Sequence, residues 1–156
     1  SNTLHDTMSE EMPKVLIDAI NLVHNKKHNP IKQDTNGVLY AKKISSSETT
    51  IDWSKNSIQL KRKLLALSSW PGCWTFHKKS RLRIHRAEVY KDIDPKKYHL
   101  PGQIIGFSSI GCPIVSCGNS SFLEILDIQK EGKNKMSSAE FFRGYKIEIG
   151  DFFEKN

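Results

Sequence analysis

The residues with the clearest capacity for chemistry are nine lysines and arginines that are grouped in one part of the chain. Four belong to a predicted helix and five to a predicted hairpin: Lys55, Lys61, Arg62, Lys63, Lys78, Lys79, Arg81, Arg83 and Arg86. Such side chains attract the phosphates of a nucleic acid, and each neutralised phosphate releases a counterion. The group therefore predicts a surface that binds a polyanion. The alternative is a solvated surface that only keeps the protein soluble.

The distribution of charge along the chain favours the first interpretation. The 156 residues carry a formal net charge of +7. Residues 55–97 contain twelve lysines or arginines against three acids, whereas residues 1–30, 31–54 and 98–156 are each neutral or carry one excess acid. A basic segment within otherwise balanced sequence is typical of a protein with a polyanionic partner. We therefore predict that one contiguous basic surface, formed by the helix and the neighbouring hairpin, binds RNA.

Large aromatic residues flank the basic segment and offer a second kind of contact with a nucleic acid, because bases stack on aromatic rings. These residues are Trp53, Trp70, Trp74 and Phe76. Aromatic residues at a junction between a helix and strands more often belong to the core, which is the interpretation we favour here. RNA would then be recognised by its backbone and shape rather than by unstacked bases.

Other residues with reactive side chains do not form a credible active site. His24 and His28 share one helical face, but a zinc site needs a third ligand, and a solvated helix end is the better interpretation. The three cysteines, Cys73, Cys112 and Cys117, are odd in number and are expected to be buried, reduced thiols. Neither a nucleophile elbow nor a phosphate-binding loop occurs. We therefore expect no metal, no cofactor and no catalytic residue in this chain.

The N-terminal third is predicted to contain a helical segment and a linker. Apolar residues recur at helical spacing through residues 4–24, and Ser9 followed by Pro13 suggests two short helices that meet near Ser9. Polar residues dominate from residue 25 to residue 50, where only Val38–Ala41 suggests a short extended piece. We expect Ser45–Thr50 to lack regular structure.

Residues 51–156 are predicted to form a mainly β, small OB-like open barrel of five to six strands with a preceding helix. The helix would span about residues 55–67, with Ser54 as its N-cap. Its apolar face would consist of Ile58, Leu60, Leu64, Leu65 and Leu67. Alternating segments separated by turn residues predict strands at 73–76, 81–90, 103–107, 113–117 and 122–129. In the second strand the apolar parity shifts, which predicts a β-bulge near His85 and Arg86. A capping pattern that begins at Ser137 predicts a last short helix over 137–144.

The composition indicates a soluble chain without a membrane span. No run of 18 apolar residues and no apolar signal core occurs, so we expect an intracellular protein. The sequence begins with Ser1 and Asn2 rather than methionine. We expect it to be a fragment of a longer protein.

Eight short motifs together resemble the methionyl-tRNA formyltransferase family, in which they occur in the same order. They cover nearly all of the chain: Thr3–Asp6, Gly37–Ile44, Ile51–Ser54, Trp70–Trp74, Arg86–Glu88, Pro101–Gly102, Gln129–Lys133 with Met136, and Phe141–Gly144. Each motif is weak alone. Together they identify the sequence as similar to the C-terminal domain of that family, with the end of its catalytic domain.

The resemblance implies both an organisation and a function. Residues 1–29 would end the N-terminal formyltransferase domain, 30–50 would be the linker, and 51–156 would be the OB-like barrel that helps to hold tRNA. The family transfers a formyl group from 10-formyltetrahydrofolate to methionyl-initiator tRNA. Its catalytic His-x-Ser-Leu-Leu-Pro-like motif is not present here, so this chain alone is expected to be inactive. It is expected to be a monomer in the bacterial cytoplasm or, alternatively, in the mitochondrial matrix.

Only two basic residues are implied by the resemblance itself. Lys42 and Lys43 match a basic position that the family places near tRNA, while the nine residues named first are candidates from charge alone. Trp70–Cys73 also resembles relatives that formylate an amino sugar or hydrolyse formyltetrahydrofolate. A domain of such a relative, without RNA binding, is therefore one alternative. A free-standing RNA-binding OB protein is the other.

Overall fold

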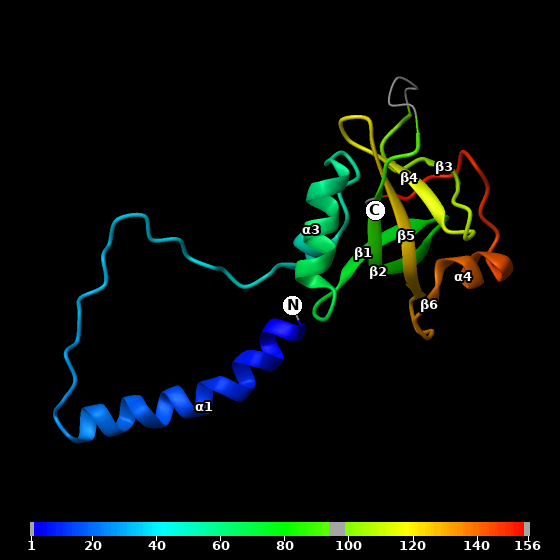
Figure 1. The fold of residues 1–156 in the computed structure, drawn as a ribbon. Coiled ribbons are helices and arrows are strands. Elements are labelled where there is room, and N and C mark those ends of the chain that lie inside the picture. The colour runs from blue at the N-terminus through cyan, green and yellow to red at the C-terminus, as the bar shows by residue number, and fades with distance from the viewer. Residues whose placement is uncertain (1, 94–98, 155–156) are drawn as a thin grey trace. The chain divides into compact units, whose positions relative to one another are not determined.

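A computed structural model describes residues 2–93 and 99–154. The chain folds into two compact units, Ser1–Lys43 and Ile44–Asn156 (Figure 1). The second unit thus begins within the range that the sequence predicts as linker. All of the hydrophobic core lies in this second unit.

The first unit contains a single long helix, α1 (Asn2–His24). The predicted division into two helices near Ser9 is wrong, because Pro13 lies inside the helix. Proline at this position removes the N–H group that would donate to the carbonyl of Ser9, but it does not interrupt the helix. The Ser9 hydroxyl instead donates to the carbonyl of His5 at 2.9 Å, which adds a bond in the turn before the proline.

The second unit is an antiparallel sheet that confirms the predicted small barrel. Its strands are β1 (Cys73–His77), β2 (Ser80–Tyr90), β3 (Ile104–Phe107), β4 (Pro113–Cys117), β5 (Ser121–Lys130) and β6 (Met136–Ser137). They are arranged in the order β1-β2-β5-β4-β3, and β6 pairs with β5. The five strands predicted from alternation and turn residues are therefore all present.

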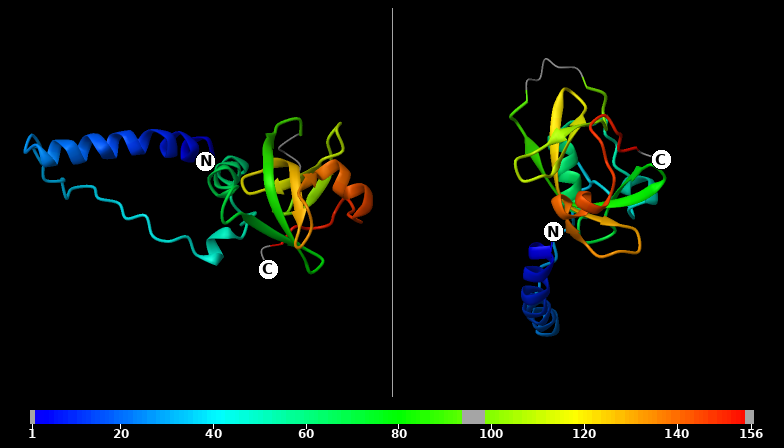
Figure 2. Two further views of the ribbon diagram at one scale, coloured as in Figure 1. Left: turned by 90° about the horizontal axis from the view of Figure 1, so that it is seen from below. Right: turned by 90° about the vertical axis from the view of Figure 1, so that its right-hand side faces the viewer.

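The C-terminal segment joins the two edges of this sheet, which the sequence did not predict. Glu154 exchanges two backbone hydrogen bonds with Phe76 of β1, at 2.8 and 3.0 Å. Phe152 bridges Gln103, next to β3, and the Phe153 N–H donates to the carbonyl of Gly102 at 2.8 Å. One short segment thus contacts β1 on one side and the start of β3 on the other (Figure 2). These bonds bridge the two edges of the open barrel.

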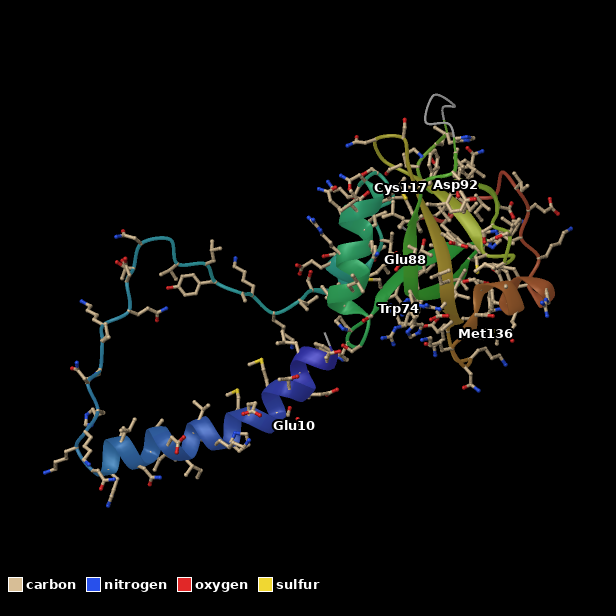
Figure 3. The ribbon with its side chains drawn as sticks, viewed as in Figure 1. Glu10, Trp74, Glu88, Asp92, Cys117 and Met136 are labelled. Carbon is tan, nitrogen blue, oxygen red and sulfur yellow. The ribbon has the colours of Figure 1, made fainter. Side chains whose placement is uncertain are left out.

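The predicted β-bulge is confirmed in β2. Its pairing with β5 shifts register between Ile84 and Arg86 and again between Arg86 and Ala87. Because of this shift, Ile84 and Ala87 both point into the core although they are an odd number of residues apart. Glu88, the next residue, is exposed (Figure 3).

Helix α3 (Ser57–Leu67) packs mainly against β2 and begins later than predicted. Its N-cap is Asn56, whose side chain accepts a hydrogen bond from Gln59 N at 2.9 Å. Ser54 is not the cap, because its hydroxyl donates to Asp52 Oδ1 at 2.6 Å in the preceding turn. Leu60 and Leu64 are buried as predicted. Ile58 and Leu65, expected on the same face, are more than half exposed.

Two short helices complete the unit. Helix α2 (Ser46–Thr49) lies where no regular structure was expected, because Ser45 and Glu48 form a capping box and Thr49 is buried. Directly after it, Thr50 bridges Trp74 of β1. Helix α4 (Ser138–Gly144) is capped by Ser137, as predicted. The Glu140 carboxylate accepts from the Ser137 hydroxyl at 2.8 Å rather than from the cap backbone.

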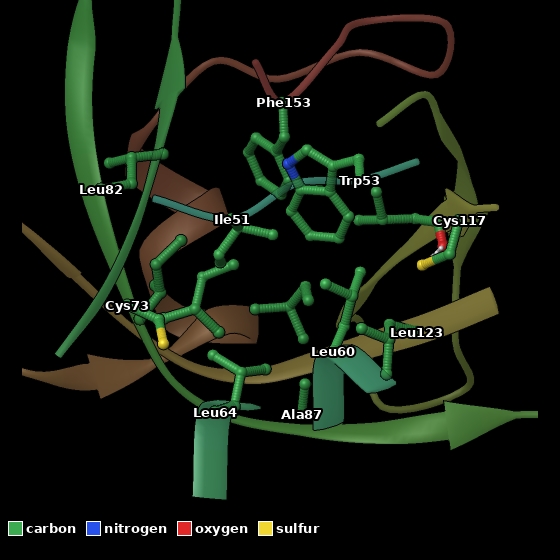
Figure 4. Close-up of a cluster of buried hydrophobic side chains, with 14 of the residues drawn as sticks. Ile51, Trp53, Leu60, Leu64, Cys73, Leu82, Ala87, Cys117, Leu123 and Phe153 are labelled. Atoms are coloured by element: carbon green, nitrogen blue, oxygen red, sulfur yellow. Dashed lines mark hydrogen bonds between the residues drawn. The ribbon is translucent and has the colours of Figure 1, made fainter. Parts of the chain in front are cut away.

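The core lies between α3 and the inner face of the sheet (Figure 4). Trp53 is buried there, stacks on Phe153 at 5.7 Å between ring centroids and donates its indole N–H to Thr75 Oγ1 at 3.0 Å. The cysteines are buried and free, as expected. Burial raises the pKa of Cys73 to about 11 and that of Cys117 to about 12. These thiols therefore remain protonated at neutral pH and act as small apolar side chains.

Candidate nucleic-acid interface

The nine basic residues predicted to form one surface fall into groups with different contacts. Lys55, Lys63 and Arg81 line a groove, Arg83 is used within the fold, and Lys61, Lys78 and Arg86 form ion pairs with acids of the sheet or the C-terminal segment. Arg62 and Lys79 are exposed. The sequence therefore located a basic region, but the structure gives its members separate roles.

The groove, which we call the Thr50 groove, consists of two adjoining cavities of about 360 Å³ and 510 Å³ that share Ser47 and Thr50. The smaller cavity is also lined by Asp52, Lys55, Gln59, Leu60 and Lys63. The larger is also lined by Ser46, Thr49, Trp74, Phe76 and Arg81. The sequence did not associate α2 with the basic residues, since tertiary contacts such as the bridge between Thr50 and Trp74 and the bond from Lys63 to Thr50 bring them together.

The cations of the Thr50 groove are held in position by neighbouring groups. The Lys63 ammonium group donates to the carbonyl of Thr50 at 2.7 Å. The Arg81 guanidinium lies 3.9 Å from the centroid of the Trp74 ring and donates to Glu131 Oε1 at 3.1 Å. Stacking on an aromatic face leaves the edge of a guanidinium available for further hydrogen bonds. A binding partner would therefore meet a fixed positive charge beside a flat aromatic surface.

Arg83 is different, although it lies on the same side of β2 as Arg81. Its Nη2 donates to the carbonyls of Ser68 and Ser69, at 2.9 and 3.1 Å, just beyond the last residue of α3. A Cβ atom added to Gly72, which has a φ of +95°, would lie 2.4 Å from Arg83 Nε. Glycine at this position thus leaves room for the guanidinium. Arg83 holds the end of α3 on the sheet rather than facing a partner.

A second group of cations is balanced by acids. Lys61 pairs with Glu88, while Arg86 and Lys135 both contact Asp127 Oδ2, at 3.0 and 3.2 Å. Although burial acts in the opposite direction, hydrogen bonds from Arg86 and Lys135 hold the pKa of Asp127 below its ordinary value. The hydrogen bond to Asp127 also raises the pKa of Arg86. These pairs reduce the positive potential available to a polyanion.

A chain of polar groups around the buried His77 joins the β1–β2 hairpin to the C-terminal segment. Lys78 Nζ lies 2.8 Å from Asp151 Oδ2, and the buried His77 ring lies between Asp151, 3.1 Å away, and the Tyr145 hydroxyl, 2.9 Å away. The hydrogen bond from Lys78 lowers the pKa of Asp151 to about 2. No local pattern in the sequence indicates this cluster, because its members are about 70 residues apart. We assign it a structural role.

The remaining candidates from the sequence have the following positions. Trp53 lies in the core, which is the interpretation that we favoured for all four aromatic residues. Trp70 is instead 70% exposed, and Trp74 and Phe76 are half-buried in the walls of the Thr50 groove. Lys42 and Lys43 are exposed at the end of the first unit.

Within residues 2–93 and 99–154 no group of three histidines, cysteines or acids has the arrangement of a metal site. In the same residues, no helix has both the length and the apolar character needed to cross a membrane.

The second unit is a small antiparallel barrel with a basic groove beside α2, and comparison with known families identifies it. Residues 43–146 match the family described as formyl transferase, C-terminal domain, and the chain belongs to that family.

Among curated proteins, the chain is similar to the methionyl-tRNA formyltransferases of Caldicellulosiruptor saccharolyticus (34% identical) and Nitrosomonas eutropha (31% identical). These alignments cover 96% and 98% of this chain, but only 46% and 47% of the relatives. The chain thus spans about half the length of the proteins it matches. The resemblance inferred from the short motifs is confirmed.

Solved structures with a similar fold include HypX from Aquifex aeolicus. A variant of that protein superposes with a TM-score of 0.60 over 94% of this chain and 27% of its own, at 16% identity. The form in complex with tetrahydrofolic acid gives a TM-score of 0.59 over 94% of this chain and 27% of its own, at 17% identity. This likeness establishes the fold alone.

Proposed function

We propose that this chain is the tRNA-binding C-terminal part of a methionyl-tRNA formyltransferase. The whole enzyme would transfer a formyl group from 10-formyltetrahydrofolate to methionyl-initiator tRNA, in the bacterial cytoplasm or, alternatively, the mitochondrial matrix. The observation that carries this proposal is the excess of cations in residues 55–97 of a chain whose relatives act on a tRNA. The barrel would contribute contacts with phosphates, and the other half of the enzyme would contribute the chemistry.

Some of the basic residues are better candidates for phosphate contacts than others. Lys55, Arg62 and Lys79 are exposed, and no acid in the described part of the chain forms an ion pair with them. Lys63 and Arg81 face the Thr50 groove. A cation without an acidic partner keeps its full charge for a phosphate. We therefore narrow the predicted set to Lys55, Arg62, Lys63 and Lys79, which form no ion pair with an acid among the described residues, and to Arg81, which faces the groove although it also pairs with Glu131. Lys42 and Lys43 are the contribution of the first unit.

The proposal is tested by equilibrium binding of initiator tRNA to the complete chain at low salt. The triple variant Lys55→Glu, Arg62→Glu, Lys79→Glu should bind at least about tenfold more weakly, because three phosphate contacts become repulsive. The matched control Lys133→Glu, Arg143→Glu, Lys146→Glu makes the same change in net charge at other exposed positions. It should bind clearly more tightly than the first variant. Equal affinities would show that only net charge matters and would refute the proposed interface.

Catalysis provides a second test. The chain alone, mixed with 10-formyltetrahydrofolate and methionyl-initiator tRNA, should form no formylmethionyl-tRNA, because the family's catalytic motif does not occur in the sequence. The product is measured by acid gel electrophoresis of the tRNA. Turnover would show that catalytic groups are present in this half after all.

The ion pairs favour one alternative, a domain of a related formyltransferase or formyltetrahydrofolate hydrolase that does not bind RNA. Lys61, Lys78, Arg81 and Arg86, four of the nine candidates, each contact an acid. If that alternative is correct, initiator tRNA will not shift this chain in a native gel at low salt.

A further inference from the structure

We propose that the Thr50 groove is a subsite for one unpaired nucleotide, with the base beside Trp74 and Phe76 and a phosphate beside Lys55 and Lys63. The inference rests on the proposed function and goes beyond it, because contacts with phosphates alone need neither an aromatic wall nor a cavity. The two halves of the groove, described below, have the chemistry of the two halves of a nucleotide.

The aromatic half of the groove comes from the edge strand β1. Trp74 and Phe76 are two residues apart and point to the same face, while Thr75 between them is buried on the other. The Arg81 guanidinium, 3.9 Å from the centroid of the Trp74 ring, adds a flat cation to this wall. Arg81 lies opposite Phe76 in the strand pairing. Bases stack both on aromatic rings and on guanidinium planes.

Hydroxyl groups line the same half. Ser46, Ser47, Thr49 and Thr50 all contribute to the larger cavity. The Thr49 hydroxyl is already used, because it donates to the carbonyl of Ser46 at 2.6 Å. A base edge that enters the cavity would meet groups that can both donate and accept hydrogen bonds. The cavity of about 510 Å³ is large enough for one base.

The cationic half lies across Thr50. The Lys63 ammonium group uses one donor on the carbonyl of Thr50, and an ammonium group has three. Lys55 is exposed at the rim. The one carboxylate in the lining, that of Asp52, accepts from the Ser54 backbone at 3.2 Å and from its hydroxyl at 2.6 Å. Two cations and one engaged acid leave this half positive, which suits a phosphate.

A nucleotide fits the combined groove better than an acidic peptide does. A row of carboxylates would match the lysines but would gain little from the wall formed by Trp74, Phe76 and Arg81. In a nucleotide the ribose lies between the base and the phosphate. In the groove, Ser47 and Thr50 lie between the aromatic and the cationic half, because they line both cavities. The shared residues would therefore lie beside the sugar.

The test compares two single-stranded probes on the complete chain at low salt: hexauridylate and a hexamer with the same ribose-phosphate backbone but no bases. Affinities are measured by fluorescence anisotropy, with initiator tRNA measured in parallel. The subsite predicts at least about fivefold tighter binding of hexauridylate, the lower end of what one stacked base contributes. Equal binding of the two probes would overturn the subsite and leave phosphate-based tRNA binding intact. No binding of any of the three would overturn the proposed function as well.

Variants locate the effect in the groove. Trp74→Leu should abolish the preference for hexauridylate, whereas Trp70→Leu removes an equally large aromatic side chain outside the groove and should retain it. If Trp74→Leu does not fold, the comparison of the two probes on the unaltered chain still decides the question. Hexaglutamate is added as a competitor. Displacement of hexauridylate by equimolar hexaglutamate would assign the groove to acidic peptides and contradict the proposal.

Discussion

The Arg83 guanidinium donates to the carbonyl of Ser68 at 2.9 Å, and this contact joins the middle of β2 to the end of α3. The carbonyls at a helix end have no partners within the helix, and a cation near them is also favoured by the helix dipole. Arg83 additionally reaches Ser69, and its Nε atom is buried beside Gly72. One side chain that the sequence marked as a ligand for phosphate therefore stabilises the fold.

Replacing Arg83 by alanine should lower the free energy of unfolding by about 2–3 kcal/mol, since charge-assisted hydrogen bonds to two carbonyls are lost. Lys79→Ala, in the exposed hairpin turn, should change it by less than about 0.5 kcal/mol. Urea denaturation monitored by circular dichroism measures both. If both variants were equally stable, Arg83 would not support α3, and its role as a phosphate ligand would need to be considered again.

Gly118 should tolerate no side chain. Its backbone N–H donates to the carbonyls of Trp53 and Lys55, both at 2.9 Å, and a Cβ atom there would lie only 1.8 Å from Ser54 O. We expect Gly118→Ala to lower stability by about 3 kcal/mol or more, because backbone must move to admit the methyl group.

Gly106→Ala is the matched control for this change. Gly106 lies in β3, where an added Cβ would meet no atom within 4 Å. Its melting temperature should stay at or above that of the unaltered chain. A Gly118→Ala protein that melts at the same temperature as Gly106→Ala would contradict the close approach of residues 53–55 to residue 118.

The Asp151 carboxylate should make stability depend on pH in acid. Its pKa is lowered to about 2 in the folded chain, chiefly by the hydrogen bond from Lys78, and is about 3.9 when unfolded. Because the pKa of Asp151 is lower in the folded chain, its ionised carboxylate stabilises the fold above about pH 3.9. This contribution is lost as the pH falls towards about 2 and the carboxylate is protonated. Asp151→Asn should therefore lower the melting temperature at about pH 6 more than at about pH 2.

Asp92→Asn serves as the control, because Asp92 is exposed and forms no ion pair with any described residue. Thermal melts at both pH values measure the effect. A loss of stability in Asp151→Asn that is the same at both pH values would show that the carboxylate contributes through its shape rather than its charge.

Local patterns in the sequence predicted most of the elements, whereas long-range contacts decided the details that were missed. Alternation predicted all five main strands, and the parity shift predicted the bulge near Arg86. The N-cap of α3 was assigned to Ser54 because the sequence does not show that its hydroxyl binds Asp52. The bridging of the two sheet edges by Phe152–Glu154 depends on pairing with residues about 50 and 80 positions earlier, which no local pattern reports.

The same limit applies to the candidate site. Arg81 and Arg83 have the same parity in one strand, and the sequence treats them alike. Both guanidinium groups lie over the Trp74 ring, Arg81 at 3.9 Å and Arg83 at 5.8 Å from its centroid. Their roles differ because Arg83 donates to the carbonyls at the end of α3, whereas Arg81 donates to Glu131 and lines the Thr50 groove. The sequence likewise placed Lys63 in a basic helix but not beside Thr50. Charge located the region, and only tertiary contacts distinguish a residue available to a ligand from one used in the fold.

If cations of the second unit bind the phosphates of a tRNA, the affinity must depend strongly on salt. The affinity of initiator tRNA should fall steeply as salt rises from about 50 to 200 mM, because each contact releases a counterion. In Lys55→Glu, Arg62→Glu, Lys79→Glu the slope of log affinity against log salt should be shallower by about 2, while Lys133→Glu, Arg143→Glu, Lys146→Glu should keep the slope of the unaltered chain. An affinity that does not change with salt, or equal slopes for the two variants, would contradict the account.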